Sequence, residues 1–192
     1  MDEPPKVLII GDSISMGYFP HAAAAAGERL ELLRHDGNGG DSANVLAQLD
    51  QWLAQFPNAA LVHLNCGLHD IKLFPPGGEH QVPIDAYREN LRTIFERVRA
   101  AGRKAVWATT TPVIDKHHAA AKDFDRHEAD VLAYNAAAAE IASSAGAGID
   151  DLHAVVERAG LVKCLAADGV HMSDAGYRAL GRAVAAACLP VT

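Results

Sequence analysis

The stretch that decides the fold is KVLIIGDS, at residues 6–13, in which an apolar run ends in a glycine and a serine. A strand that is covered on both faces carries apolar residues without alternation, as the central strands of parallel sheets do. Gly11 permits a tight turn after such a strand. Ser13 would then lie at the N-terminus of a helix, where backbone N–H groups lack helical partners. Residues 6–11 therefore predict a central parallel strand that leads directly into a helix.

Apolar runs of this kind recur along the chain and alternate with segments of helical spacing. We expect further strands at residues 30–35, 59–65, 105–109 and 148–151. We expect helices from a Ser42 cap to Phe56, from Tyr87 to a stop at Gly102, over residues 128–145, and from a Ser173 cap to Cys188, ended by Pro190. Such alternation predicts an α/β fold, a three-layer α/β/α sandwich around a parallel sheet of about five strands. No repeat or linker divides the chain, so we expect one domain over residues 1–192.

The charge balance argues against two classes of partner. The chain has 24 acidic and 17 basic residues and a formal net charge of −7. A nucleic-acid-binding protein needs basic side chains to displace counterions from phosphates, and an anionic membrane surface attracts basic segments in the same way. We therefore expect no nucleic acid and no membrane as partners. No signal-peptide pattern precedes the short apolar run at residues 7–10, which predicts a cytoplasmic protein unless a leader has been removed.

The three cysteines, Cys66, Cys164 and Cys188, are too few and too scattered for a disulfide framework or a zinc cluster. A Cys164–Cys188 bridge stays open, but reduced thiols are favoured in a cytoplasmic protein. Cys66 follows an expected strand and is interpreted as a small core residue, not as a second nucleophile.

A second polar motif stands just before the last expected helix. Asp168-Gly169-Val170-His171 places a carboxylate three residues ahead of an imidazole. A compact turn there would let Asp168 accept a hydrogen bond from one ring nitrogen of His171, while the other nitrogen faces Ser13 as a general base. Each motif alone also has a structural interpretation, since serine often caps helices and the chain has 10 histidines.

Two further motifs follow the second and third expected strands. Residues 37–42, GNGGDS, open a helix, which would aim the Gly40 N–H at the same centre. Residues 65–70, NCGLHD, follow the next strand. The carboxyl ends of parallel strands share one edge of the sheet, and ligands bind beyond that edge. The long loops at residues 67–83 and 111–127 are expected there too.

With these motifs in order, the chain resembles the SGNH hydrolase (GDSL-like lipase/acylhydrolase) family. That family carries Gly-Asp-Ser after its first strand, a Gly after its second, Gly-x-Asn-Asp after its third and Asp-x-x-His before its last helix. The matching segments here are Gly11-Asp12-Ser13, Gly40, Gly67-Leu68-His69-Asp70 and Asp168-Gly169-Val170-His171, with further similarity at Thr111-Pro112-Val113 and residues 171–177. The resemblance covers nearly the whole chain.

The resemblance implies a flavodoxin-like sandwich and the hydrolysis of esters or thioesters with no cofactor and no metal. Carried over by position, Ser13 is the nucleophile, His171 the base and Asp168 the residue that orients it. The N–H groups of Ser13 and Gly40 form two arms of the oxyanion hole. The family's third arm is an Asn side chain, and His69 stands at that position here. We expect a neutral His69 to donate a hydrogen bond to the oxyanion in its place.

The expected substrate is a small-molecule, short-chain acyl ester, such as an O-acetyl group on a carbohydrate or another small soluble ester, because the chain shows no apolar lid segment. A thioesterase or lysophospholipase of the same mechanism is the alternative. Two alternative functions would not use this mechanism. The chain could be a ligand-binding relative that has lost catalysis, or a flavin- or nucleotide-binding module. The retained Ser13, Asp168 and His171 disfavour the first, and the lack of a Gly-rich phosphate loop after the first strand disfavours the second. The oligomeric state is left open.

Four other polar residues of the two long loops receive mostly structural interpretations. His117 and His118 are expected to be solvent-exposed, because no partner stands at metal-ligand spacing. Arg126 either meets an anionic group of the substrate or lies at the surface. Asp70 is expected to tie down its own loop and not to act as an acid.

Overall fold

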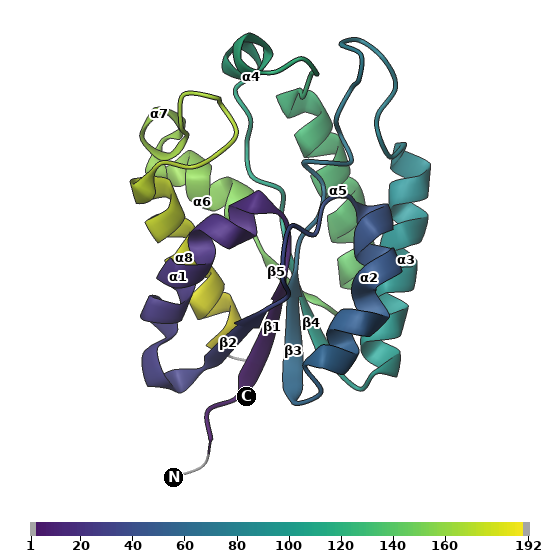
Figure 1. Ribbon diagram of the computed structural model, residues 1–192, viewed down its shortest axis with the longest axis vertical. Helices are drawn as coiled ribbons and strands as arrows, with labels where there is room; N and C mark the ends of the chain where they lie inside the picture. The colour runs from purple at the N-terminus through teal and green to yellow at the C-terminus, as the bar shows by residue number, and fades with distance from the viewer. Residues whose placement is uncertain (1–2, 190–192) are drawn as a thin grey trace.

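The computed structural model describes residues 3–189, which form a five-stranded sheet with helices on both faces (Figure 1). The strands are β1 (Lys6–Ile10), β2 (Glu31–Arg34), β3 (Ala59–Leu64), β4 (Lys104–Ala108) and β5 (Gly148–Asp150). Their order is β2-β1-β3-β4-β5, and every neighbouring pair is parallel. This is the flavodoxin-like order. The predicted α/β fold with a parallel sheet of five strands is confirmed.

The helices form a layer on each side of the sheet. They are α1 (Ser13–Ala26), α2 (Ser42–Gln55), α3 (Ile84–Ala100), α4 (Asp115–Ala121), α5 (Glu128–Ser144), α6 (Leu152–Ala159), α7 (Leu161–Cys164) and α8 (Asp174–Cys188), with a short 3₁₀ turn η1 at Gly27–Arg29. α1 packs on α8 and α6 packs on α8, while α3 contacts both α2 and α5 on the other side (Figure 1). None of the helices in residues 3–189 is both long and apolar enough to span a membrane.

The core lies along the central strands, as their unbroken apolar runs predict. Leu8, Ile9 and Ile10 of β1 are fully buried, as are Leu64 of β3 and Trp107 of β4. Successive residues of a strand point to opposite faces, so burial of consecutive residues requires helices on both. The three cysteines are buried and unpaired.

Two local predictions, an N-cap at Ser42 and an irregular loop over residues 111–127, are wrong. Ser42 is not a cap but the first residue of α2; the N-cap is Asp41, whose side chain accepts a hydrogen bond from the Asn44 N–H at 2.9 Å. The expected loop at residues 111–127 contains the short helix α4. The Ser173 cap of α8 is confirmed, since its hydroxyl accepts from the Gly176 N–H. The predicted stop at Pro190 lies outside the described residues.

The two helices that border the carboxyl edge, α1 and α8, touch at glycines. A Cβ atom at Gly181 of α8 would stand 2.6 Å from the Cβ of His21 and 2.7 Å from the backbone nitrogen of Ala22, both in α1. A Cβ at Gly17 of α1 would stand 2.1 Å from the Tyr177 ring of α8. Larger residues at these points would force the helices apart. The contact positions two chain segments, because Ser13 begins α1 and α8 starts just after residue 171.

The replacement Gly181→Ala should lower the free energy of unfolding by about 1–3 kcal/mol, the usual cost of overpacking a tight contact. Urea unfolding monitored by circular dichroism measures it. Ala186→Leu, at an exposed position of the same helix, adds more atoms but points them into solvent. This control should stay within about 0.5 kcal/mol of the wild type. Equal stability of the Gly181→Ala variant and the wild type would contradict the packing argument.

Candidate active site

Ser13, His171 and Asp168 form a hydrogen-bonded series at the carboxyl edge of the sheet. Ser13 is the first residue of α1, directly after the turn that follows β1, and the other two lie on the loop between α7 and α8. The Ser13 Oγ and the His171 Nε2 are 3.1 Å apart, and the His171 Nδ1 and the Asp168 Oδ2 are 2.6 Å apart. The three residues that the motifs singled out therefore meet, although 158 positions separate Ser13 from His171.

The loop that carries Asp168 is folded by its own backbone. Asp168 Oδ1 accepts hydrogen bonds from the N–H groups of Val170 at 3.1 Å and His171 at 2.9 Å. Gly169 has φ +70° and sits so close to α4 that a Cβ would stand 2.7 Å from the Ile114 carbonyl oxygen. Only glycine adopts this conformation there without strain or collision. The Asp-Gly-x-His spacing thus forms a tight turn that brings the Asp168 carboxylate within hydrogen-bond distance of the His171 ring.

Electrostatics keep this carboxyl group ionised. Burial alone raises the pKa of Asp168, but the hydrogen bonds from the His171 ring and from two backbone N–H groups outweigh it and bring the pKa to about 2. An ionised carboxylate only accepts hydrogen bonds, so the His171 Nδ1 must carry the proton. In the neutral ring Nε2 is then an acceptor, and it faces the hydroxyl of Ser13. The His171 side chain is 40% exposed, so the series is open to a ligand.

The turn that presents Ser13 is held by Asp12 and His35. Asp12 is the N-cap of α1 and its Oδ1 accepts from the Ile14 N–H at 2.9 Å. The Gly11 N–H donates to the His35 Nε2 at 3.4 Å, while the His35 Nδ1 donates to the Asp36 carbonyl oxygen at 3.0 Å. His35 is fully buried and stacks on a tryptophan. Burial lowers its pKa and so favours the neutral ring that these two contacts require.

The loop that carries Gly40 lies against this turn. The Gly39 N–H donates to the Gly11 carbonyl oxygen at 3.0 Å, and a Cβ at Gly39 would stand 2.8 Å from that oxygen. Gly40 has φ +68°. Its N–H donates to the side-chain oxygen of Asn38 at 2.8 Å. The N–H of Ser13, by contrast, has no hydrogen-bond partner among residues 3–189.

His69 is half-buried, and its ring makes no hydrogen bond within the described residues. Burial is the main cause of a lowered pKa, and the positive charges of Arg126 and Lys72 act in the same direction, whereas Asp12 opposes them. The ring is therefore neutral at neutral pH. A neutral imidazole offers one N–H donor and one acceptor nitrogen.

Asp70, the residue after His69, joins this loop to the start of α2. Both of its carboxyl oxygens accept from the Ser42 N–H, at 2.9 and 3.1 Å. The Ser42 hydroxyl in turn accepts from the side-chain amide of Asn90 at 3.0 Å. Asp70 is fully buried, and burial raises its pKa to about 7 in spite of these bonds. The loops of Gly40 and His69 are thus fixed to each other by one buried carboxyl group.

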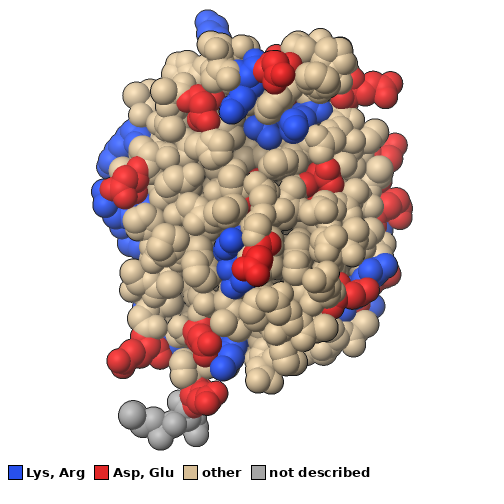
Figure 2. Space-filling model, viewed as in Figure 1, with Lys and Arg blue, Asp and Glu red and all other residues tan. Residues whose placement is uncertain are grey.

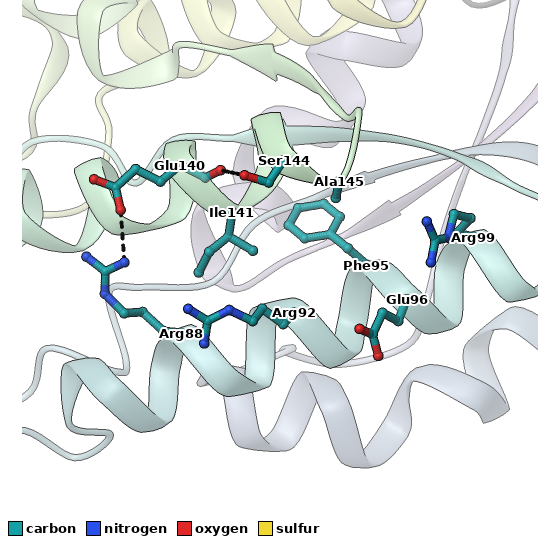
Figure 3. A pocket seen from close by; sticks show the side chains of 9 residues that line it. All are labelled: Arg88, Arg92, Phe95, Glu96, Arg99, Glu140, Ile141, Ser144 and Ala145. Atoms are coloured by element: carbon teal, nitrogen blue, oxygen red, sulfur yellow. Dashed lines mark hydrogen bonds and ion pairs between the residues drawn. The ribbon is translucent and has the colours of Figure 1, made fainter.

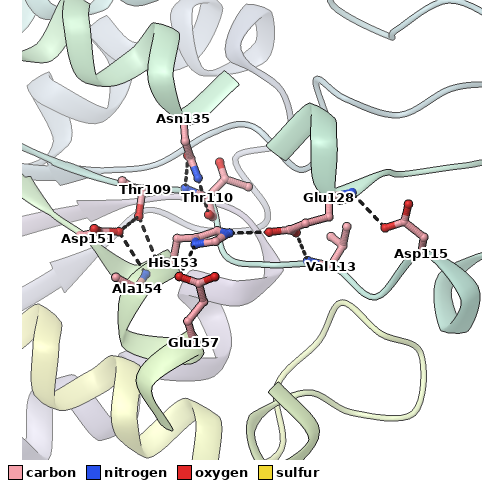
Figure 4. A network of polar contacts seen from close by, with 10 residues as sticks. All are labelled: Thr109, Thr110, Val113, Asp115, Glu128, Asn135, Asp151, His153, Ala154 and Glu157. Atoms are coloured by element: carbon pink, nitrogen blue, oxygen red, sulfur yellow. Dashed lines mark hydrogen bonds and ion pairs between the residues drawn. The ribbon is translucent and has the colours of Figure 1, made fainter. Parts of the chain in front are cut away.

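A network of polar contacts holds both ends of the segment 111–127 (Figure 4). Glu128, at the start of α5, accepts from the Val113 N–H at 2.8 Å and from the His153 Nε2 at 2.6 Å. The Glu128 N–H donates to Asp115 at 2.9 Å. The hydrogen bond and charge of Glu128 raise the pKa of His153, although burial opposes this. Hydrogen bonds to Glu128 therefore hold the start of α4, and the segment 111–127 is not a freely solvated loop.

Two residues of this segment lie elsewhere than the sequence predicts. The sequence predicts a solvent-exposed His118, but the residue is fully buried, with its ring 5.1 Å from that of Phe124 and neither ring nitrogen bonded in the described part of the chain. Arg126, for which a surface position was one alternative, is only 7% exposed. Both are buried because the segment packs back on the molecule, and no periodicity in a short irregular segment signals that.

A pocket between α3 and α5 is lined by none of the three residues of the series (Figure 3). It is a cavity of about 350 Å³, lined by Arg88, Arg92 and Arg99 of α3 and by Glu140 and Ile141 of α5, among others. Arg88 already pairs with Glu140 at 2.9 Å. None of the residues singled out from the sequence lines it. Among residues 3–189, no group of three His, Cys, Asp or Glu side chains is arranged to hold a metal ion.

Comparison with known proteins adds a family and several structural relatives. The model of the GDSL-like Lipase/Acylhydrolase family matches residues 9–179. A lipase/acylhydrolase from Enterococcus faecalis is similar in structure, with a TM-score of 0.78, 20% sequence identity and coverage of 95% of this chain and 94% of that one. The acetylxylan esterase Axe2 from Geobacillus stearothermophilus has a TM-score of 0.76 and 18% identity, covering 97% and 96%. LAE5, an alpha/beta hydrolase enzyme from the metagenome of Lake Arreo in Spain, has a TM-score of 0.78 and 18% identity, covering 98% of each chain. At these identities the structures establish the fold alone. A search of curated protein sequences found no match.

The raised pKa of Asp70 predicts how pH affects stability. The folded protein holds the Asp70 proton up to about pH 7, whereas the unfolded chain releases it near pH 4. The stability that wild-type protein owes to this proton is therefore lost as pH rises between those values. The free energy of unfolding of the wild type minus that of Asp70→Asn should fall by roughly 1 kcal/mol per pH unit from pH 5 to 7 and level off above it.

Urea unfolding at four pH values measures this difference. Asp36→Asn, which changes an exposed carboxyl group, is the matched control and should follow the wild type at every pH. A constant difference between the wild type and Asp70→Asn across the range would contradict the assignment.

Proposed function

Because the chain belongs to the GDSL-like lipase/acylhydrolase family, we propose that it is a serine ester hydrolase that cleaves short-chain acyl esters through an acyl-serine intermediate. The observation that carries the proposal is the series from Ser13 through His171 to Asp168, with separations of 3.1 and 2.6 Å. A hydroxyl, a neutral imidazole and an ionised carboxylate in that order constitute an activated nucleophile.

In the proposed reaction, His171 Nε2 takes the hydroxyl proton of Ser13 as Oγ attacks the carbonyl carbon of the ester. The carbonyl oxygen becomes an oxyanion, and Asp168 stabilises the imidazolium that forms. When the tetrahedral intermediate collapses, the carbon–oxygen bond to the alcohol breaks and His171 gives its proton to the leaving oxygen. A water molecule then repeats these steps on the acyl-serine, with His171 again as base, and releases the carboxylic acid and free Ser13.

Three donors are proposed for the oxyanion. The Ser13 N–H lies at the half-buried start of α1 and is unbonded within residues 3–189, so it is available to the oxygen formed next to Oγ. The Gly40 N–H becomes available when the exposed Asn38 side chain releases it. His69 supplies the third donor as a neutral ring, in the place of the family's Asn. Arg126 and Lys72 help to keep that ring neutral, which avoids a second cation beside the imidazolium of His171.

Small acyl groups fit the site better than long ones. The base is 40% exposed and the nucleophile is half-buried, with no apolar segment of the described chain folded over them as a lid. Axe2, one of the similar structures, is an acetylxylan esterase, which favours an acetyl group on a carbohydrate or another small soluble alcohol. A thioester would follow the same steps with sulfur as the leaving atom.

Purified protein should hydrolyse p-nitrophenyl acetate and butyrate, with kcat/KM falling from butyrate to octanoate. Ser13→Ala should lower kcat by roughly 10⁴-fold or more, because the nucleophile is lost, and a fluorophosphonate probe should label Ser13. Ser144→Ala, which removes an exposed hydroxyl of α5, is the control and should be as active as the wild type. Activity that survives in Ser13→Ala would refute the nucleophile, and higher kcat/KM for acetyl thioesters than for acetyl esters would make the protein a thioesterase.

The role of His69 can be tested separately. His69→Ala should lower kcat by roughly 10²–10³, the usual cost of losing one oxyanion donor, while the melting temperature stays near that of the wild type. His69→Asn should retain much more activity, since the Asn amide restores a donor. Near-normal kcat in a folded His69→Ala protein would show that two backbone N–H groups suffice.

A further inference from the structure

Two cations whose charges act on His69 lie against one aromatic ring, that of Phe124. The Lys72 Nζ is 4.5 Å from the centroid of the Phe124 ring, and the guanidinium carbon of Arg126 is 5.0 Å from it. Lys72 follows β3, whereas Arg126 precedes α5, so the pair is assembled from distant segments. Two hydrogen bonds of 3.0 Å between the backbones of Leu73 and Asp125 join these segments. The position of both cations is therefore fixed by backbone pairing.

Within residues 3–189, Arg126 forms hydrogen bonds through only one of its side-chain nitrogens. The residue is 7% exposed, and its Nε–H donates to the carbonyl oxygen of Leu68. Neither Nη atom forms a hydrogen bond or an ion pair with any residue from 3 to 189, and neither is fully buried. A nearly buried cation without a partner is unfavourable unless something supplies the opposite charge. The free edge of the guanidinium presents a planar pair of donors, which suits a carboxylate or phosphate.

The charges of two carboxylates near the groups of the proposed reaction act on the guanidinium. Burial lowers the pKa of Arg126 to about 10, and the charges of Asp12 and Asp168 act against that shift, so the group stays protonated at neutral pH. Asp12 precedes Ser13, and Asp168 contacts His171. Asp12 accepts from the Ile14 N–H through Oδ1, while its Oδ2 has no hydrogen-bond partner in the described residues. Neither carboxylate forms an ion pair with Arg126 within residues 3–189.

The distribution of charged side chains over the surface is consistent with a local cationic site. Figure 2 shows Lys and Arg side chains gathered at the top of the molecule, where Figure 1 places α4 and the long loops, although acidic side chains lie among them. The chain as a whole carries a net charge of −7. Lys72, like Arg126, has no ion pair in the described residues. Two unpaired cations at one edge of an acidic protein indicate a ligand of opposite charge.

We propose that Arg126 and Lys72 bind an anionic group, a carboxylate or a phosphate, on the ester that Ser13 attacks. The inference rests on the proposed esterase function and narrows its substrate to acyl esters of acidic molecules. Arg126 holds the anion by its two Nη donors, and Lys72 adds a second positive charge across Phe124. The anion replaces the missing partner of Arg126 and positions the ester beside Ser13.

Matched pairs of esters test this with the intact protein. The neutral 4-acetoxybenzamide is compared with 4-acetoxybenzoate and with 4-acetoxyphenyl phosphate, which distinguishes the two anions. A p-nitrophenyl hemisuccinate and butyrate pair places the charge on the acyl side. In the wild type, at least one anionic ester should exceed its neutral partner in kcat/KM by about tenfold or more, as a charge-assisted hydrogen bond provides.

Variants then assign the preference to its residues. Arg126→Gln, which keeps an amide donor for the Leu68 carbonyl, should bring the ratio of anionic to neutral kcat/KM close to one. Lys72→Gln should lower that ratio in part. Lys122→Gln removes an exposed lysine of the same segment and, as the charge-matched control, should leave the ratio within about twofold. Thermal melting monitored by circular dichroism shows whether each variant folds.

The outcomes separate this inference from the proposed function. Hydrolysis of the neutral esters with no preference for any anionic partner overturns the anion site and leaves the esterase intact. A preference that persists in folded Arg126→Gln also overturns it. If Arg126→Gln does not fold, the wild-type ratios and Lys72→Gln decide. Failure to hydrolyse any ester, neutral or anionic, removes the esterase proposal and this inference with it.

Discussion

The hydrogen bond between His171 Nδ1 and Asp168 Oδ2 is the contact on which the rest of the site depends. An imidazole can accept a proton at Nε2 only if Nδ1 carries its hydrogen, and a carboxylate that cannot donate enforces that tautomer. Asp168 stays a carboxylate because two backbone N–H groups and the ring itself stabilise its charge more than burial opposes it. The tight turn at Gly169 is therefore as much a part of the proposed chemistry as the side chains it presents.

The distance from this loop to Ser13 is set by helix packing. Ser13 is the first residue of α1, and α8 starts three residues after His171. The two helices meet at Gly17 and Gly181, where no Cβ fits. A shift of either helix along or away from the other moves the hydroxyl relative to the imidazole, and the 3.1 Å contact tolerates little movement. The small residues of α1 and α8 thus link core packing to the geometry of the site.

Most of the fold could be predicted from the sequence because it follows from periodicity. The five strands and the long helices α2, α3, α5 and α8 fall within a few residues of their predicted positions. The meeting of Ser13 with His171 was also predictable, since both motifs follow elements that end at one sheet edge. The roles of these residues, and those of Gly40 and His69, stay predictions.

What the sequence could not predict is side-chain burial in the irregular segments. Ser42 and Asp41 are both good capping residues, and only the buried Asp70, which takes the Ser42 N–H, decides between them. His118 and Arg126 are hydrophilic and lie among charged residues, so their local sequence indicates exposure. They are buried because residue 125 pairs with residue 73, some fifty positions away. Contacts between residues so far apart in the chain cannot be recognised from the spacing or composition of the local sequence.

The position of His69 connects these observations. An Asn amide is uncharged at any pH, whereas a histidine is a neutral donor only where its surroundings suppress protonation. Here burial does most of this, and Arg126 and Lys72 contribute. The same two cations form no ion pair within residues 3–189, so one electrostatic feature would serve both proposals, a neutral donor toward the oxyanion and an anionic group bound nearby. The histidine proposed in place of the family's amide and the anion site proposed at Arg126 are therefore best understood as one arrangement, because the cations that help to keep the His69 ring neutral are the ones that would attract the anion.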